Sequence, residues 1–268
     1  MLGAIVGFAE KNRLFPAKYR ILQQEIKLPV DDAKCIVFLL PCTAEAFEGL
    51  SPVVQEKMLS RLKRTMEKAG VVCVYAVRRL RDKISGKFYM PDGRRIFCAF
   101  AGQIIERHCK TFSLAPDTTR VCIYENPYSA AGATAAQHMA MHTKQLFLVS
   151  PDVRGAAQVA AKLLDEFGLA AGASQNEKLL NTADIVLLLS APSAEVLSTG
   201  LVLDFSGKYP YRACRDTYFE PAFGFAPLFH YLERADCRSA EFMLSCCGYD
   251  TENIHQNLDA IGWKPKKA

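Results

Sequence analysis

Between residues 120 and 210, short continuous apolar runs alternate with stretches whose apolar residues recur at helical spacing. Continuous apolar runs of four to eight residues are typical of strands buried on both faces, and the helical period is typical of amphipathic helices. The predicted strands cover residues 121–124, 144–149, 169–173, 184–189 and 200–205, and the predicted helices cover 129–142, 153–167 and 175–182. Alternation of this kind predicts an α/β fold with a parallel sheet covered by helices on both faces, in the order of a Rossmann-like domain.

The N-terminal region repeats the alternation on a smaller scale. The run at 35–40 predicts a buried strand, and a weakly amphipathic stretch covers 13–27 before it. Ser51 followed by Pro52 is a helix-start signal, apolar residues then recur at helical spacing, and Gly70 ends the helix. The run at 71–77 predicts a second strand, parallel to the first.

A different pattern follows at 87–100, where Asp92-Gly93 separates two runs rich in aromatic and β-branched residues. Asp-Gly between such runs predicts a β-hairpin. Residues 112–119 then predict a connection. We therefore expect two domains, residues 1–117 as an α/β domain with a hairpin and residues 118–268 as the Rossmann-like domain, with a C-terminal helical return near 225–234.

The composition is that of a globular protein of 268 residues, half of them hydrophobic and 23% charged. No apolar run reaches the roughly 20 residues that cross a bilayer, so we expect no membrane insertion. Residues 1–8 lack the cationic start and long apolar core of a signal peptide. A cytoplasmic location is the expectation.

Ten cysteines are present, but no pair has CxxC spacing, and several lie within apolar strand-like runs. We expect reduced, buried thiols. Two sets of residues have metal-ligand chemistry, and for both we favour packing over a metal site because no tight ligand pairs or third ligand accompany them. They are His138 with His142, and a C-terminal set of Cys214, Cys237, Cys246, Cys247, His230 and His255.

The formal charge of +5 is unevenly distributed, with Lys and Arg outnumbering acidic residues between Arg78 and Lys110. A solvated face is the interpretation that we favour, and a polyanion or nucleic-acid site in the 78–95 region is the alternative. The region lacks the interleaved aromatic side chains of single-strand binders, so we do not expect nucleic acid as the partner.

Candidate chemistry gathers after the strands of the second domain. In an open parallel sheet, ligands bind beyond the carboxyl ends of the strands, near the point where strand order reverses. Four segments end there, 125–132, 150–152, 190–192 and 206–208, and Tyr209, Tyr211 and Arg212 follow the last of them. We predict cofactor contacts from Asn126, Ser129, Gly132, Asp152 and Ser190, and we assign no catalytic residue.

Three segments of this domain carry a family resemblance. They are Thr182-Ala183-Asp184-Ile185-Val186, the segment 201–206 with the sequence Leu-Val-Leu-Asp-Phe-Ser, and the helix ending in Leu-Asp-Glu-Phe-Gly at 164–168. The chain here resembles the NAD(P)-binding domain of the shikimate-dehydrogenase and glutamyl-tRNA-reductase group, over roughly 90 residues. The resemblance implies a Rossmann fold, NAD or NADP as cofactor, oxidoreductase chemistry and a small-molecule ligand in the cleft between two domains. It does not extend to the N-terminal half or to that family's catalytic residues.

The phosphate-binding turn departs from the glycine-rich pattern of that family. Glu125 stands near the place of the first glycine, Pro127 removes an amide donor, and Tyr128 adds bulk. A carboxylate near a diphosphate costs about 1 kcal/mol at 4 Å in water and more in a drier site. In favour of binding, Ser129 and Gly132 are small and lie at the start of a helix, whose N-terminus attracts anions.

The second strand end leaves the choice of cofactor open. Asp152 stands where an acidic residue would bind the ribose hydroxyls of NAD, and Arg154 could contact the 2′-phosphate of NADP. Asp152 could equally be a solvated residue that starts the next helix.

Three hypotheses follow. The first is an NAD(P)-dependent oxidoreductase of unknown substrate. The second is a non-catalytic descendant of the fold, acting as a ligand sensor or an assembly subunit and forming a homo-oligomer. The third is polyanion binding through the basic region.

Overall fold

The computed structural model describes residues 2–10, 20–30, 33–84, 88–115, 117–198, 200–206, 219–220, 228, 231–232, 236–249 and 253–265. The chain forms two compact units, which are described separately. The first consists of residues 1–93 and 217–265, and the second of residues 94–216 and 266–268.

The first unit contains a four-stranded mixed sheet in the order β2-β3-β1-β4. Its elements are β1 (Leu2–Phe8), β2 (Leu22–Lys27), β3 (Lys34–Leu40), α1 (Ala44–Glu48), α2 (Pro52–Lys68), β4 (Cys73–Ala76), α3 (Arg78–Ile84), β10 (Phe219–Glu220), α8 (Cys237–Cys246), α9 (Ile254–Ala260) and β11 (Lys264–Pro265). Strand β1 pairs in parallel with β3 and β4, whereas β2 pairs antiparallel with β3. The parallel orientation predicted for the strands at 35–40 and 71–77 is therefore confirmed, with β1 lying between them.

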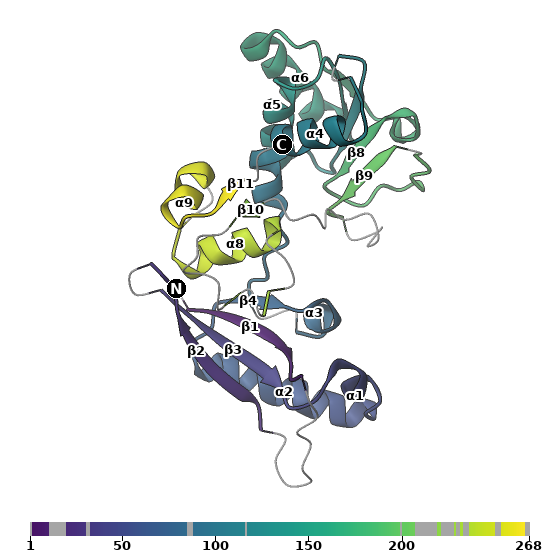
Figure 1. Cartoon of the computed structure of the whole chain (residues 1–268). Helices are drawn as coiled ribbons and strands as arrows, with labels where there is room; N and C mark the ends of the chain where they lie inside the picture. The colour runs from purple at the N-terminus through teal and green to yellow at the C-terminus, as the bar shows by residue number, and fades with distance from the viewer. Residues whose placement is uncertain are drawn as a thin grey trace. The chain divides into compact units, whose positions relative to one another are not determined.

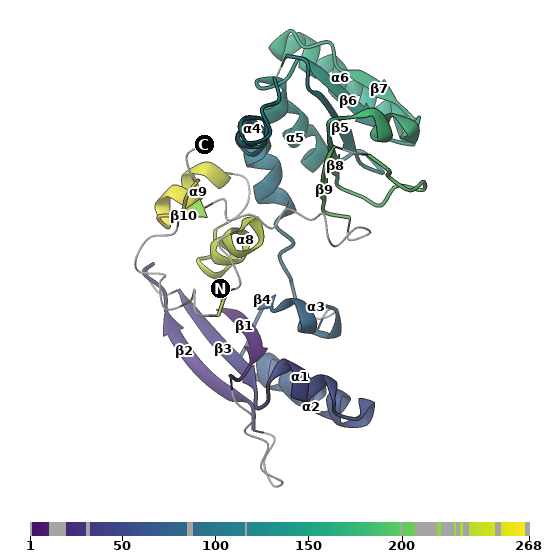
Figure 2. The ribbon, with the colours of Figure 1, turned by 45° about the vertical axis from the view of Figure 1, so that its right-hand side comes forward.

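Alternating residues of β1 face two different layers. Ala4 and Val6 join a core formed with Leu62 and Met66 of α2. Gly3 faces α8, where a Cβ on it would lie 2.0 Å from the Sγ of Cys246. Figures 1 and 2 show α2 and α8 on opposite sides of this sheet. Burial on both faces explains why β1 is a continuous apolar run.

The second unit contains a five-stranded parallel sheet in the order β7-β6-β5-β8-β9. Its elements are α4 (Arg94–Thr111), β5 (Arg120–Tyr124), α5 (Ala130–Ala140), β6 (Gln145–Val149), α6 (Val153–Phe167), β7 (Gly172–Ser174), the 3-10 helix η1 (Glu177–Thr182), β8 (Ile185–Leu188) and β9 (Leu201–Asp204). The α/β fold, the two domains and the Rossmann-like order predicted from the sequence are confirmed.

Helices α5 and α6 pack on β6 from one face of this sheet, and η1 packs on the other face. Figure 2 shows α4 and α5 together on one side of β5, β8 and β9. Helix α4 approaches α5 closely at Gly102, where a Cβ would lie 2.4 Å from the carbonyl oxygen of His138. This close contact explains why α4 belongs to the second unit.

The hairpin predicted at 87–100 is wrong. Tyr89 forms a single parallel bridge to Cys73, and α4 begins at Arg94 directly after the Asp92-Gly93 turn. The apolar residues that suggested a strand are the start of a helical pattern that continues to Cys109 and is buried along most of its length. Gly93 has a φ of +82°, the left-handed conformation that the turn was expected to need.

The compact units also divide the chain elsewhere than at the predicted boundary of 117/118. Residues 112–119 connect α4 to β5 as predicted, but both of these elements belong to the second unit. Of the predicted return at 225–234, only residues 228, 231 and 232 are described. In the amphipathic stretch at 13–27, residues 22–27 form the edge strand β2, and residues 13–19 lie outside the described part.

Candidate functional site

The candidate site lies at the carboxyl edge of the parallel sheet of the second unit. Strand β5 is paired with β6 on one side and with β8 on the other, so the strand order reverses there. The predicted residues Asn126, Ser129 and Gly132 follow β5, Asp152 follows β6, and Ser190 follows β8.

The carboxylate of Glu125 occupies the start of α5. Glu125 is 4% exposed, and its two oxygens accept hydrogen bonds from Ser129, one from the backbone N–H at 2.9 Å and one from the Oγ at 2.6 Å. A Cβ on Gly132 would lie 2.2 Å from the Oε2 of Glu125. Gly132 is therefore the residue that allows this carboxylate to reach the helix.

Ser129 is the N-cap of α5 and uses its hydrogen-bonding groups within the turn. Its Oγ accepts a hydrogen bond from the N–H of Ala131 at 3.1 Å while donating to Glu125. A serine cap and a carboxylate at a helix N-terminus both stabilise the helix, because they complement its exposed N–H groups and its dipole. Two of the N–H groups at the start of α5, those of Ser129 and Ala131, are thus engaged internally.

Asn126 and Ser190 are brought together by the structure. The backbone N–H of Asn126 donates to the Oγ of Ser190 at 2.7 Å, which ties the turn after β5 to the end of β8. Asn126 is exposed and Ser190 is half-buried. The Asn126-Pro127 peptide bond is cis.

Tyr128 spans the starts of α5 and α6. Its Cε1 lies 2.9 Å from the position of a Cβ on Gly132, and its Cβ lies 3.2 Å from that of Gly155. The hydroxyl is buried and has no hydrogen-bond partner among the described residues. Burial raises the pKa of this hydroxyl, and the nearby Glu125 and Cys98 raise it further. The bulk expected from the sequence is therefore present where the two helices begin.

Asp152 is the N-cap of α6. Its Oδ1 accepts from the N–H of Gly155 at 3.2 Å, and its own N–H donates to the Oγ of the buried Ser150 at 3.1 Å. The Oδ2 lies 2.5 Å from the position of a Cβ on Gly155. These contacts are those of a residue that starts the next helix, which was the alternative interpretation of Asp152. A role in binding a ribose stays a prediction.

A polar network that the sequence analysis missed lies on the other face of the sheet. The hydroxyl of Tyr124 donates to Glu177 at 2.8 Å, and Glu177 also accepts from the N–H groups of Ser193 at 3.2 Å and Ala194 at 2.7 Å. Burial acts to raise the pKa of Glu177, but the hydrogen bonds outweigh it and the pKa is lowered. Tyrosine at the end of a buried strand was the available signal, because its hydroxyl needs a partner.

The last strand end carries a second missed pair. Asp204 is buried, and its Oδ1 accepts from the N–H of Ser206 at 2.7 Å and from its Oγ at 2.6 Å. The residues that follow this strand end in the sequence lie outside the described residues. They are Gly207, Lys208, Tyr209, Tyr211 and Arg212.

In the described part of the chain, no group of three His, Cys, Asp or Glu side chains could hold a metal ion. The Nδ1 of His142 lies 3.6 Å from a carboxylate oxygen of Glu106, across the contact between α5 and α4. Nine cysteines are described and none of them forms a disulfide. Burial raises the pKa of Cys73 and that of Cys122 to about 12. Cys214 and His230 lie outside the described residues.

The basic region is divided between the two units, with α3 in the first and α4 in the second. In α3, Arg79 already forms ion pairs with Glu45 at 3.0 Å and with Glu48 at 3.6 Å. The three residues are exposed, so these pairs contribute little to stability. They do reduce the positive charge that this face offers to a polyanion.

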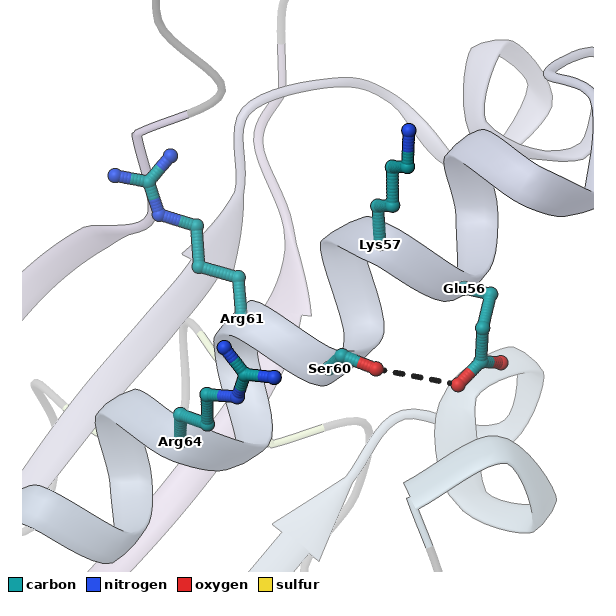
Figure 3. A pocket seen from close by; sticks show the side chains of 5 residues that line it. All are labelled: Glu56, Lys57, Ser60, Arg61 and Arg64. Carbon is teal, nitrogen blue, oxygen red and sulfur yellow. Dashed lines mark hydrogen bonds between the residues drawn. The ribbon is translucent and has the colours of Figure 1, made fainter.

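A shallow hollow of about 460 Å³ lies on α2 in the first unit. It is lined by Glu56, Lys57, Ser60, Arg61 and Arg64, all from this one helix. Figure 3 shows Ser60 hydrogen-bonded to Glu56, and Lys57 and Arg61 extending away from the helix in diverging directions. None of the predicted site residues lines it.

No protein-family model matches the chain, and no curated protein matches it. Solved structures do match. L-tryptophan dehydrogenase from Nostoc punctiforme is 12% identical with a TM-score of 0.40, and the match covers 85% of this chain and 67% of that one. Quinate dehydrogenase from Corynebacterium glutamicum in complex with NAD is 9% identical, with a TM-score of 0.34 and coverage of 97% and 99%. A shikimate dehydrogenase in complex with NADP+ is 12% identical, with a TM-score of 0.33 and coverage of 97% and 95%.

At these identities the likeness is one of fold. The fold itself follows from the strand topology, with two α/β units of which the second contains a Rossmann-like parallel sheet. Among the described helices, none combines the length and the apolar character that crossing a membrane would require.

Proposed function

We propose that this chain is a non-catalytic Rossmann-like subunit, in which an internal carboxylate takes the place of the cofactor phosphate at α5. The observation that carries the proposal is the buried Glu125, bonded to Ser129 and lying against Gly132. A sensor or assembly role is the function that we propose for a domain of this architecture without its dinucleotide.

The dinucleotides NAD and NADP do not fit the turn as it is built. A pyrophosphate at α5 would need the N–H of Ser129, which donates to Glu125, and the close approach at Gly132, which Glu125 fills. Each hydrogen bond lost by a charged group costs about 1.5–3 kcal/mol. Like charges 4 Å apart add about 1–4 kcal/mol, depending on how much water is excluded. Because 1.4 kcal/mol is a tenfold change in affinity, binding at this turn is weakened by at least about sixtyfold.

An NAD(P)-dependent oxidoreductase is the second candidate. The observation that favours it is the hydrogen bond between Asn126 and Ser190 at the point where strand order reverses, with Asp152 following the neighbouring strand. Cofactor contacts from Asn126, Ser129, Gly132, Asp152 and Ser190 belong to this second candidate. The substrate of such an enzyme is unknown. The small-molecule ligand and the cytoplasmic location also stay predictions.

Calorimetric titration with NAD, NADH, NADP and NADPH at millimolar concentration separates the two candidates. We expect no binding by the wild type. Glu125→Gly should create measurable binding, because it removes a like charge and opens the approach to Gly132. Adding Gly132→Asp to that variant should abolish the binding again.

Glu166→Gln is the matched control, since it removes one carboxylate from the exposed part of α6 and leaves the turn unchanged. It should bind no dinucleotide. Micromolar binding by the wild type, unaffected by Glu125→Gly, would overturn the proposal and favour the oxidoreductase.

A further inference from the structure

Helix α6 exposes an apolar stripe that its own unit does not cover. Only Ala156 and Leu163 of this helix are buried. Val153 is 37% exposed, Leu164 is 53% exposed and Phe167 is 42% exposed. Exposed apolar residues scattered singly are common on protein surfaces, but a continuous stripe along a helix indicates an interaction surface.

The stripe has large residues at its ends and small ones at its centre. Val153 and Leu164 are eleven residues apart, about three helical turns, and therefore lie on nearly the same side of the helix. The exposed Ala157 and Ala161 lie between them along the same flank. Small residues at the centre of a helix face allow a second helix to approach closely.

Charged residues border the same flank, with opposite signs at opposite ends. Arg154 and Asp165 are also eleven residues apart, so they follow one edge of the stripe. Neither has an ion-pair partner in the part of the chain that the structure describes. The helix is therefore positive at one end of this edge and negative at the other.

We propose that α6 of a second copy of this chain packs antiparallel on this stripe, related by a two-fold axis. In that arrangement Val153 faces Leu164 of the second copy, and Ala157 faces Ala161. Arg154 faces Asp165 of the second copy on the same edge. The midpoints of all three pairs fall between residues 158 and 160, so one axis satisfies the apolar and the ionic pairs together.

A two-fold axis also repeats each contact, because such an interface uses the same patch on both subunits. A parallel partner related by a two-fold axis would instead carry its Arg154 and Asp165 to the opposite edge of the stripe, so neither ion pair would form. The occupant that complements both the shape and the charge of the stripe is thus the stripe itself. The inference rests on α6 alone and holds whether or not α5 binds a dinucleotide.

The interface is small. A helix of 15 residues is about 22 Å long, so one helix pair buries less than the roughly 1,600 Å² of a standard interface. Figure 2 shows the edge strand β7 beside α6, where it could extend the contact. We expect a dimer with a dissociation constant in the micromolar range, and its affinity should fall with salt.

Sedimentation velocity of the full chain from about 5 to 500 µM tests the proposal. The wild type should shift from monomer to dimer over this range. Arg154→Glu and Asp165→Arg should each remain monomeric, because each places like charges opposite one another. The double variant Arg154→Glu/Asp165→Arg should dimerise as the wild type does.

Lys162→Glu is the control for charge, since this exposed residue lies on the other flank of α6, and it should leave the dimer unchanged. Leu164→Glu should abolish it, and equal melting temperatures would show that the variants are folded. A monomeric wild type at 500 µM, or a double variant that fails to restore the dimer lost in the single variants, overturns the proposal.

Discussion

Two helix starts at the same sheet edge differ in where their capping carboxylate comes from. Helix α6 is capped by Asp152, the residue directly before it, and helix α5 is reached by Glu125 from the end of the preceding strand. In both helices the third residue is a glycine, Gly155 or Gly132, and in both a Cβ there would meet a carboxylate oxygen.

The two carboxylates differ in how easily water or a ligand could displace them from the helix start. Asp152 is half-buried and makes a cap of the ordinary kind, in which a side chain satisfies one orphan N–H group. Glu125 is buried against Tyr128 and Gly132, and both of its oxygens are bonded to Ser129. A cap can rotate away at small cost, whereas a buried carboxylate that holds the preceding turn cannot. The α5 start is therefore the more closed of the two.

Replacing the two glycines should give the largest contrast. Gly132→Ala should lower the free energy of unfolding by about 2–3 kcal/mol, because the buried Glu125 and Tyr128 have no room to move. Gly155→Ala should cost about 1 kcal/mol or less, since Asp152 can shift and alanine is the better helix former. Urea unfolding of both variants measures the difference.

The double variant Gly132→Ala/Glu125→Ala tests the cause. The free energy of unfolding that it loses should be smaller than the sum of the losses in the two single variants, because the Cβ of residue 132 then meets no carboxylate. Equal losses for Gly132→Ala and Gly155→Ala would contradict the distinction between the two helix starts.

Removing the carboxylates themselves should give a smaller contrast in the same direction. Glu125→Ala should cost about 2 kcal/mol, since it deprives the N–H and the Oγ of Ser129 of a charged acceptor. Asp152→Ala should cost about 1 kcal/mol, the usual effect of losing an N-cap. Thermal unfolding compares them, and a larger loss for Asp152→Ala would show that Glu125 is not the main support of its turn.

Much of this sheet could be predicted from the sequence because its signals are local. The predicted helix at 153–167 coincides with α6, and Gly168 ends it with a φ of +67°. The continuous apolar runs gave the strands of the parallel sheet, and the alternation with helices gave their order. At 94–100 the same signal misled, because a run of five apolar residues at 96–100 fits a strand and a helix equally well.

The candidate site was predictable by position but not by contact. The segments that meet at the carboxyl edge follow from topology, so Asn126 and Ser190 were expected near each other. Glu125 was recognised as an obstacle to phosphate, but its bonds to Ser129 depend on a rotamer that packing against Tyr128 and Gly132 decides. The Tyr124–Glu177 pair joins residues far apart in sequence, so the buried tyrosine signals that its hydroxyl needs a partner but not which residue supplies it.

The Tyr124–Glu177 pair gives the smallest expected effect on stability, and it extends the comparison to the other face of the sheet. The hydrogen bonds of Glu177 lower its pKa below the ordinary value of 4.5. A carboxyl group whose pKa is lowered by folding stabilises the folded state above its unfolded pKa, and this stabilisation is lost as the pH falls through the folded pKa. Glu177→Gln should therefore lower the free energy of unfolding by about 1 kcal/mol at pH 7, because the hydrogen-bond donors lose a charged acceptor, and by less near pH 3.

Tyr124→Phe removes one of the donors but keeps the carboxylate, so the free energy that it costs should vary less between pH 7 and pH 3. Urea unfolding of the wild type and both variants at the two pH values measures this, and a Glu177→Gln loss that is constant with pH would show that the Glu177 charge contributes nothing to the fold.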